Sequence, residues 1–298
     1  MQKQNAFSLC HPLVSFLYFA LVLFFSMFFM HPACLIISLA CAIGYSAFLT
    51  AGKASSFSFR FVLPMALLAA VVNPAFNHQG ATILCYLPSG NPLTAQSIFY
   101  GLASSAMLAA VILWFVCFTE IVSSDKFVYL FGRIVPALSL ILSMTLRFVP
   151  AFVRQMRQVS DARRCMHGGE KETSLPARVK GAAAVFSATV TWSLENAVET
   201  ADSMKARGYG LPGRTAFSIY RLEGRDRFLL RWLALCGVYV FLGWSRGAFD
   251  FRYYPAVHAA ELSAFSLSFY LAYFALCLTP LVLDGMEERK WKQLRSGT

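Results

Sequence analysis

Six apolar runs occupy most of the chain, and polar or charged residues separate them. The runs cover about residues 13–30, 33–50, 61–76, 95–119, 228–245 and 262–283. A helix needs about 20 apolar residues to cross the hydrocarbon core of a bilayer, with a range of about 17–25. The runs therefore predict six transmembrane helices, of which 61–76 is short enough to form a re-entrant hairpin instead.

The segment 121–227 differs from the runs on either side of it. It holds sixteen Lys and Arg residues and nine acids, without a Gly/Ser linker. Connecting segments of this length usually have structure and function of their own. The predicted organisation is therefore N-terminal transmembrane helices in 1–120, a cytoplasmic or interfacial helical region in 121–227, C-terminal transmembrane helices in 228–283 and a basic cytoplasmic tail in 284–298.

The first of two long helices in this region is predicted over about 134–165. Its front half, IVPALSLILSMTL, is apolar for only 13 residues, and beyond Pro150 the pattern becomes amphipathic. Arg147, Arg154, Arg157 and Arg164 recur 7, 3 and 7 residues apart, which places them on one helix face. That face is either a surface for solvent and lipid headgroups or a docking face for another protein.

The second long helix is predicted over about 176–207, with Ser174 as its N-cap and Pro176 in its first turn. Apolar and small residues recur along it at helical steps: Val179, Ala183, Phe186, Val190, Ala197, Ala201 and Met204. Their neighbours include the small residues Gly181, Ala182 and Ala184. Because small residues let helix backbones approach closely, the two long helices are predicted to cross and pack against each other.

Gly208 is predicted to end the second helix. Glycine is the preferred residue for the left-handed turn that stops a helix, and Gly210 with Pro212 prevents continuation. Arg207 is then the last side chain before the stop. Taken alone, a cation in this position is a helix-dipole contact of about 0.3–1 kcal/mol.

Composition and charge support a membrane protein. Of 298 residues, 57% are hydrophobic and 14% are charged, whereas soluble domains carry about 25% charge. The net charge of +11 indicates cytoplasmic loops rather than nucleic-acid binding, since no basic face with interspersed aromatic residues occurs outside the apolar runs. With both termini inside, 24 of 26 Lys and Arg residues (26 minus Arg246 and Arg252) are cytoplasmic.

Sequence motifs of catalysis and of cofactor binding are missing from the chain. It has no G-x-x-x-x-G-K-[ST] phosphate loop, so it is not predicted to be an ATPase itself. Its five histidines never stand four residues apart, and its eight cysteines form no C-x-x-C pair. We therefore expect no catalytic residue, metal site or cofactor in this chain.

Three segments resemble one known family and occur in that family's order. They are NPAFNHQGATILCYL at 73–87, SDKFVYLFGRIVPALSLILSMTLRFVP at 124–150, which ends in the motif LRFVP at 146–150, and SMKARGYG at 203–210. Together with the apolar runs they resemble the transmembrane T subunit (EcfT/CbiQ family) of energy-coupling factor (ECF) transporters. The resemblance covers most of the chain.

The resemblance implies a role in an ABC-type importer of vitamins or metal ions in a bacterial cell membrane. In such transporters two cytosolic ATPases bind ATP and Mg, a separate membrane S subunit binds the substrate, and the T subunit joins them. The family's second coupling motif falls on Ala206, Arg207 and Gly208. The first falls near 165–167, which contains no arginine, so Arg163 or Arg164 is expected to take its role.

Two other classes of function remain open from the residues alone. A membrane-embedded enzyme, such as a lipid-modifying transferase, would need carboxylates or histidines inside the membrane. Glu120, Asp250, Glu261 and Asp284 all lie at the edges of apolar runs, where solvent contact is expected. A self-contained secondary transporter would be expected to show convergent charges or an inverted repeat, and neither is visible.

Overall fold

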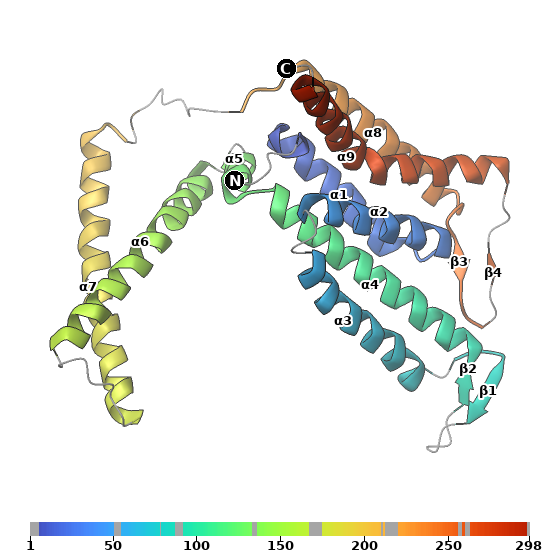
Figure 1. The fold of residues 1–298 in the computed structure, drawn as a ribbon, viewed down its shortest axis with the longest axis horizontal. Coiled ribbons are helices and arrows are strands. Elements are labelled where there is room, and N and C mark those ends of the chain that lie inside the picture. The colour runs from blue at the N-terminus through green and yellow to red at the C-terminus, as the bar shows by residue number, and fades with distance from the viewer. Residues whose placement is uncertain are drawn as a thin grey trace. The chain divides into compact units, whose positions relative to one another are not determined.

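The computed structural model describes residues 6–50, 55–77, 79–86, 92–132, 136–166, 175–209, 211, 220–255, 258–259 and 263–296. The chain forms two compact units. The first unit combines Met1–Ser123 with Tyr220–Thr298, and the second unit is Ser124–Ile219. Nearly all of the described secondary structure is helical (Figure 1).

Each of the six predicted apolar runs forms a helix of the first unit. These helices are α1 (Pro12–Phe28), α2 (Pro32–Thr50), α3 (Ser55–Phe76), α4 (Ala95–Ile121), α8 (Gly224–Ser245) and α9 (Ala264–Ser296). Helices α2, α4, α8 and α9 are long and apolar enough to cross a membrane, whereas α1 and the 60–76 part of α3 are shorter apolar helices. The chain is therefore an all-α polytopic membrane protein, as predicted.

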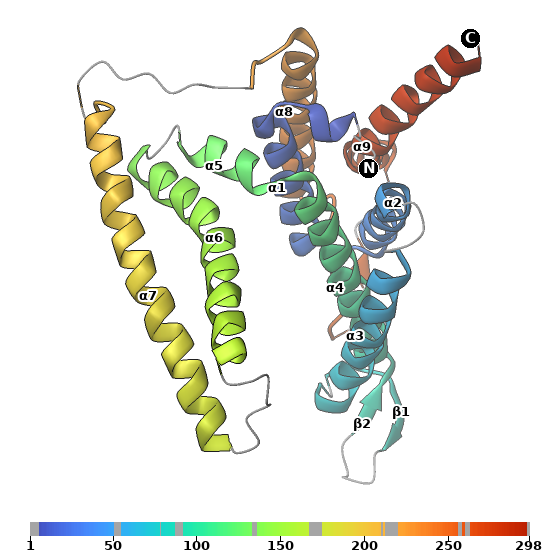
Figure 2. The same cartoon turned by 60° about the vertical axis from the view of Figure 1, so that its left-hand side comes forward.

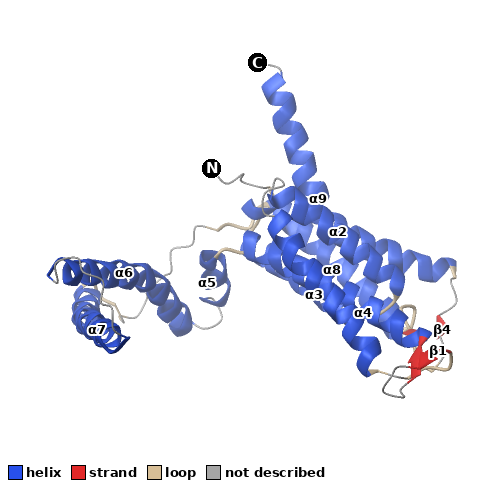
Figure 3. Ribbon diagram, turned by 60° about the horizontal axis from the view of Figure 1, so that its bottom comes forward, coloured by secondary structure: helices blue, strands red, loops and turns tan. Residues whose placement is uncertain are grey.

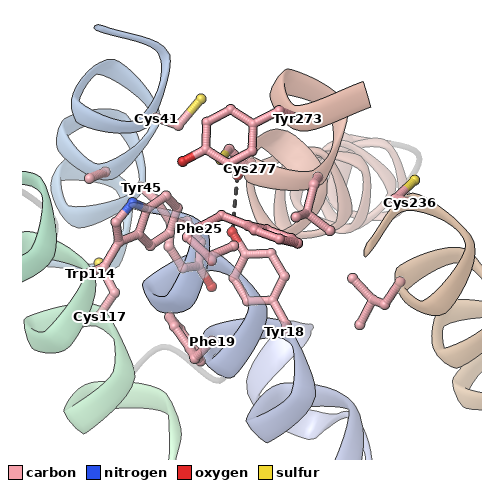
Figure 4. Close-up of a cluster of buried hydrophobic side chains, with 14 of the residues drawn as sticks. Tyr18, Phe19, Phe25, Cys41, Tyr45, Trp114, Cys117, Cys236, Tyr273 and Cys277 are labelled. Atoms are coloured by element: carbon pink, nitrogen blue, oxygen red, sulfur yellow. Dashed lines mark hydrogen bonds between the residues drawn. The ribbon is translucent and has the colours of Figure 1, made fainter. Parts of the chain in front are cut away.

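Aromatic side chains fill the core of the first unit. Trp114 of α4 is completely buried, and its ring lies 6.0 Å from Tyr18, 6.4 Å from Phe19 and 6.4 Å from Tyr45 (Figure 4). The hydroxyl of Tyr18 donates a hydrogen bond of 3.1 Å to the backbone oxygen of Cys277 (Figure 4). Helices α1, α2, α4 and α9 thus meet around one aromatic cluster.

A buried polar network crosses the same core. The Ser26 and Ser38 hydroxyls lie 2.7 Å apart, the indole N–H of Trp114 donates to Ser38 over 3.0 Å, and the Tyr273 hydroxyl lies 3.2 Å from Ser26. These groups satisfy one another, which avoids the several kcal/mol of folding free energy that an unsatisfied polar group costs in hydrocarbon. The network joins α1, α2, α4 and α9 at defined positions.

Two buried carboxylates hold one end of the first unit together. Asp284 of α9 accepts hydrogen bonds from the backbone N–H of Phe7 (2.8 Å) and from the hydroxyl of Tyr45 (3.1 Å). Asp226 at the start of α8 accepts from the N–H of His11 (3.4 Å). Asp284 is only 3% exposed, so the expectation of solvent contact was wrong for it. The N-terminal segment covers this carboxylate, and sequence spacing does not show that contact.

Two short hairpins lie at the opposite end of the first unit (Figure 3). Their antiparallel strands are β1 (Ile83–Tyr86), β2 (Pro92–Thr94), β3 (Phe251–Arg252) and β4 (His258–Ala259). The Asn77 side-chain amide donates to the Tyr254 hydroxyl (3.1 Å), and the Tyr253 hydroxyl donates to the backbone oxygen of Met30 (2.7 Å). The apolar pattern did not predict these strands, which are too short to show a periodicity.

The second unit contains the two long helices, preceded by a short helix that the sequence pattern did not separate. Its elements are α5 (Ser124–Gly132), α6 (Pro136–Met166) and α7 (Leu175–Ala206). Helices α6 and α7 confirm the predictions for 134–165 and 176–207, and they cross and pack as expected (Figures 1 and 2). Pro176 lies in the first turn of α7, whereas Ser174 lies outside the described residues.

The face that α7 buries is not the predicted stripe. Gly181 and Thr189 are its buried residues, whereas Val179 and Phe186 of the predicted stripe are 68% and 61% exposed. Glycine still allows the close approach that small residues were expected to provide. The prediction of packing was correct, and so was the part given to Gly181, whereas the large apolar residues Val179 and Phe186 of the predicted stripe stay exposed.

Candidate functional site

The C-terminal end of α7 has a well-defined capping geometry. The N–H of Tyr209 donates to the oxygen of Met204 over 3.0 Å, and the N–H of Gly208 donates to the oxygen of Lys205 over 2.9 Å. Gly208 has a φ of 78°, in the left-handed region. This pair of bonds around a left-handed glycine is the Schellman motif. The prediction that the helix stops at Gly208 is confirmed.

Arg207 is held at this end by its backbone while its side chain is exposed. Its N–H donates to the oxygen of Ser203 over 3.2 Å, which continues the helical pattern. Its guanidinium makes no ion pair within the part of the chain that the structure describes. An arginine offers five N–H donors in a planar fork that matches a carboxylate. The geometry therefore presents an available bidentate donor at the tip of a helix.

The residues around Arg207 leave its side chain accessible. Ala206 before it is small and exposed, and Gly208 after it has no side chain. Lys205 pairs with Asp202 over 3.6 Å, and these side chains are 78% and 70% exposed. Exposed pairs of this kind contribute little, about 0–1 kcal/mol. Lys205 therefore has a partner on its own helix, unlike Arg207.

The end of α6 carries the arginines expected to serve the first motif. Arg163 is half-buried and Arg164 is exposed, and both lie in the last turn of the helix. An Nη1 atom of Arg164 lies 3.9 Å from an Asp161 carboxylate oxygen, and both side chains are more than 70% exposed. Cys165 and Met166 follow as exposed residues, and residue 167 lies outside the described residues.

The structure does not bring the two arginine positions together. Helices α6 and α7 run in opposite directions, and their C-terminal ends lie at opposite ends of the crossed pair (Figure 2). Helix α7 has 32 residues, which corresponds to about 48 Å at 1.5 Å per residue. Arg207 and the Arg163–Arg164 pair are therefore two separate sites, each able to contact a different partner molecule.

Two further surfaces of the second unit are exposed. The basic face of α6 carries Arg147, Arg154, Arg157 and Arg164, all of which are exposed as their spacing predicted. Helix α7 exposes an apolar stripe whose large members are Val179, Phe186, Leu194 and Val198, each more than 60% exposed. Sequence reasoning assigned two of these four residues, Val179 and Phe186, to the helix crossing. The signal for an exposed stripe was that apolar and small residues cover more of the helix than one contact can bury.

The described residues contain no group of three or more His, Cys, Asp or Glu side chains that could hold a metal ion. Of the four acids at the edges of apolar runs, Asp284 is engaged in the contacts described above, and Glu261 lies outside the described residues. Glu120 and Asp250 are exposed. The exposed arginines at the two helix tips are the candidate sites that the sequence motifs indicated.

Comparison with known proteins decides the family. A family model for CbiQ, described as a cobalt transport protein, matches residues 10–217, from the start of the bundle to beyond the tip of α7. The chain belongs to the CbiQ family. A relative described as "Energy-coupling factor transporter transmembrane protein EcfT", from Lactobacillus helveticus (strain DPC 4571), is 28% identical over 102 residues. That match covers 34% of this chain and 37% of the relative's length.

The description of the CbiQ family is that of a transport protein. The apolar helices of the first unit agree with that assignment, since four of them are long enough to cross a membrane. The matched range includes both candidate tips, with Arg163, Arg164 and Arg207.

Proposed function

We propose that this chain is the coupling subunit of an ECF transporter. It joins two cytosolic ABC-type ATPases to a substrate-binding S subunit in the membrane, for ATP-driven uptake of a vitamin or a metal ion. The observation that carries this proposal is Arg207, which is exposed at the tip of a 32-residue helix that ends in a Schellman motif at Gly208. The CbiQ family match and the name of the EcfT relative support it.

The proposed role of the α7 tip is to transmit force. The guanidinium of Arg207 pairs with carboxylates in a groove of one ATPase, where partial burial strengthens the pair. Gly208 lets the backbone approach the groove, and Ala206 adds no bulk. When ATP closes the ATPases, a helix of about 48 Å moves as a rigid body and carries the displacement away from the tip.

The α6 tip supplies the second contact. Arg164 is exposed and its pair with Asp161 is weak enough to exchange for a stronger partner, so it is the better placed of the two arginines there. Because the two tips lie at opposite ends of the crossed pair, each serves one ATPase. This chain does no chemistry in the proposal: ATP and Mg are bound and ATP is hydrolysed in the ATPases.

The S subunit is proposed to dock on the apolar stripe of α7. Val179, Phe186, Leu194 and Val198 are exposed in the chain by itself, and a partner in the membrane would cover them. The S subunit, and not this chain, selects the substrate. The family description names cobalt, which makes a metal ion one of the substrates to test first.

The proposed orientation places both termini in the cytoplasm of a bacterial cell. Contacts of Phe7 and Asp284 bring the N-terminal segment and the C-terminal part of α9 to one end of the first unit. Arg246 and Arg252 belong to the opposite end, with the hairpins, and the other Lys and Arg residues then lie inside. An excess of positive charge on cytoplasmic segments is the usual rule for polytopic proteins.

The test is affinity purification in mild detergent followed by mass spectrometry. The unmutated chain should bring along two ATPases and a small membrane protein. The Arg207→Glu variant should lose ATPase while keeping the membrane partner, because the charge is reversed only at the tip. Lys205→Glu is the matched control, since Lys205 is an exposed cation on the same turn that pairs with Asp202, and it should keep the ATPases.

Each other outcome has a defined meaning. If ATPases accompany Arg207→Glu as well as the unmutated chain, Arg207 only stabilises the helix end and the tip is not the coupling site. If no ATPase accompanies the unmutated chain, the coupling function is wrong. Uptake by the chain alone in liposomes would then identify a self-contained transporter.

A further inference from the structure

An apolar pocket of about 450 Å³ lies in the first unit, beside the end that carries the hairpins. Its walls come from the N-terminal ends of α2 and α4 and from strand β3. The buried residues Leu35, Ala103 and Tyr253 form its floor, and the exposed residues Ile36, Phe99 and Leu102 form its rim. The proposed coupling function does not involve this pocket.

The floor of the pocket is closed and its polar group is engaged. Leu35, Ala103 and Tyr253 are each less than a tenth exposed and form a small core cluster of their own. The hydroxyl of Tyr253 donates to the backbone oxygen of Met30 over 2.7 Å. Every lining residue is apolar apart from this tyrosine. The pocket therefore has no free polar group with which to orient a polar ligand.

The rim opens sideways on membrane-spanning helices. Ile36 is 68% exposed, and Phe99 and Leu102 are more than half exposed. They lie in the spans Pro32–Leu49 and Ala95–Ile121. A side chain on the outer face of such a helix meets lipid hydrocarbon rather than water. What enters the pocket therefore comes from within the bilayer.

We propose that this pocket holds one acyl chain of a membrane phospholipid. A dry apolar cavity of about 150 Å³ is enough for a six-carbon ring, so roughly three times that volume suits a chain of many carbons. The acyl chain would pack against α2, α4 and β3, and so fill a gap that no described side chain fills. The proposal is independent of the coupling function.

The pocket is expected to bind the acyl chain of the phospholipid without recognising its headgroup. Phe251 and Tyr253 line the pocket, so the alternation of a strand turns Arg252 between them to the other side. The Arg252 guanidinium lies 3.9 Å from a carboxylate oxygen of Asp250. Because no charged residue lines the pocket, phosphatidylcholine, phosphatidylethanolamine and phosphatidylglycerol with the same chains should bind equally well.

The experiment uses native mass spectrometry to count the phospholipids that the full-length protein retains. The protein is released from detergent micelles that contain the dioleoyl form of one of the three lipids. Ala106 lines the pocket, so Ala106→Phe fills it and should reduce the retained number by about one per chain. Ala234→Phe makes the same change on an exposed position of α8 and should leave the number unchanged. Equal retention of the three lipids by the unmutated chain is also expected.

A second measurement does not depend on the folding of a filled variant. Phe99→Trp places a reporter at the rim, and brominated dioleoyl phosphatidylcholine added in detergent should quench it saturably at about one lipid per chain. Leu271→Trp is the control, since Leu271 is 61% exposed on α9 away from the pocket. Its quenching should rise with lipid fraction without saturating at one equivalent.

Three results would overturn the proposal. Unchanged lipid retention in Ala106→Phe together with unsaturable quenching at position 99 would show that the pocket holds no chain. A strong preference for phosphatidylglycerol would show that charge, and not the pocket, retains the lipid. Loss of a co-purifying membrane protein from Ala106→Phe, with lipid retained, would assign the pocket to a side chain of that partner.

Discussion

Asp284 is predicted to stabilise the first unit through two bonds to distant segments. Its carboxylate accepts from the N–H of Phe7 at 2.8 Å and from the hydroxyl of Tyr45 at 3.1 Å, and the residue is 3% exposed. A hydrogen bond to a charged group contributes about 1.5–3 kcal/mol, and an abandoned buried partner costs about 1–3 kcal/mol. Asp284→Asn keeps one acceptor and loses the charge, so we expect a loss of about 2–4 kcal/mol of unfolding free energy.

The assay is a double-mutant cycle with Tyr45→Phe, which removes only the hydroxyl. The unfolding free energies of the unmutated chain, the two single variants and the double variant are measured in mixed micelles by a reversible denaturant titration. The expected coupling energy between Asp284 and Tyr45 is about 1.5–3 kcal/mol, the value of one hydrogen bond to a charged group. In a thermal assay, each kcal/mol should lower the melting temperature by about 2–4 °C for a domain of this size.

Asp250→Asn is the control for removal of a carboxylate. Asp250 lies next to the hairpin, its side chain is 64% exposed, and its oxygen is 3.9 Å from the Arg252 guanidinium. An exposed pair of this kind contributes about 0–1 kcal/mol, so its replacement should hardly change stability. A coupling energy below about 0.5 kcal/mol between Asp284 and Tyr45 would refute the reasoning, because additive effects are the mark of residues that do not interact.

Three further predictions follow from particular positions. Gly243→Ala would bring a Cβ to 2.7 Å from the Phe269 ring and should lower the unfolding free energy by about 1–3 kcal/mol. In Gly285→Ala the added Cβ meets nothing within 4 Å, so this variant should gain up to about 1 kcal/mol of unfolding free energy. Equal melting temperatures of the two variants would contradict this prediction. Gly208→Ala places a Cβ at a φ of 78°, which should cost about 1–2 kcal/mol and accelerate amide exchange in the last turn of α7; unchanged exchange would disprove it. Burial lowers the pKa of His31, so the unfolded chain takes up a proton near pH 6.5 before the folded chain does, and stability is lost as the pH falls below that value. His31→Asn should flatten the dependence of melting temperature on pH between about 7 and 5.

The sequence alone determined which segments are helices and where one of them ends. The length and apolarity of a run decide whether it can cross a bilayer, and both are local properties of the chain. The stop at Gly208 is local as well, because glycine adopts the left-handed conformation without a steric cost. For these reasons the six apolar helices of the first unit, the two long helices of the second unit and the end of α7 at Gly208 were predicted correctly, whereas the short helix α5 was not.

The tertiary structure alone decided which faces and which polar groups are buried. Asp284 stands at the edge of an apolar run, and only the return of Phe7 and Tyr45 to its side removes it from solvent. Along α7 the tertiary structure buries Gly181 and Thr189 and leaves Val179 and Phe186 exposed. Such choices depend on contacts between residues far apart in the sequence, whereas composition and periodicity report only on neighbours within one segment.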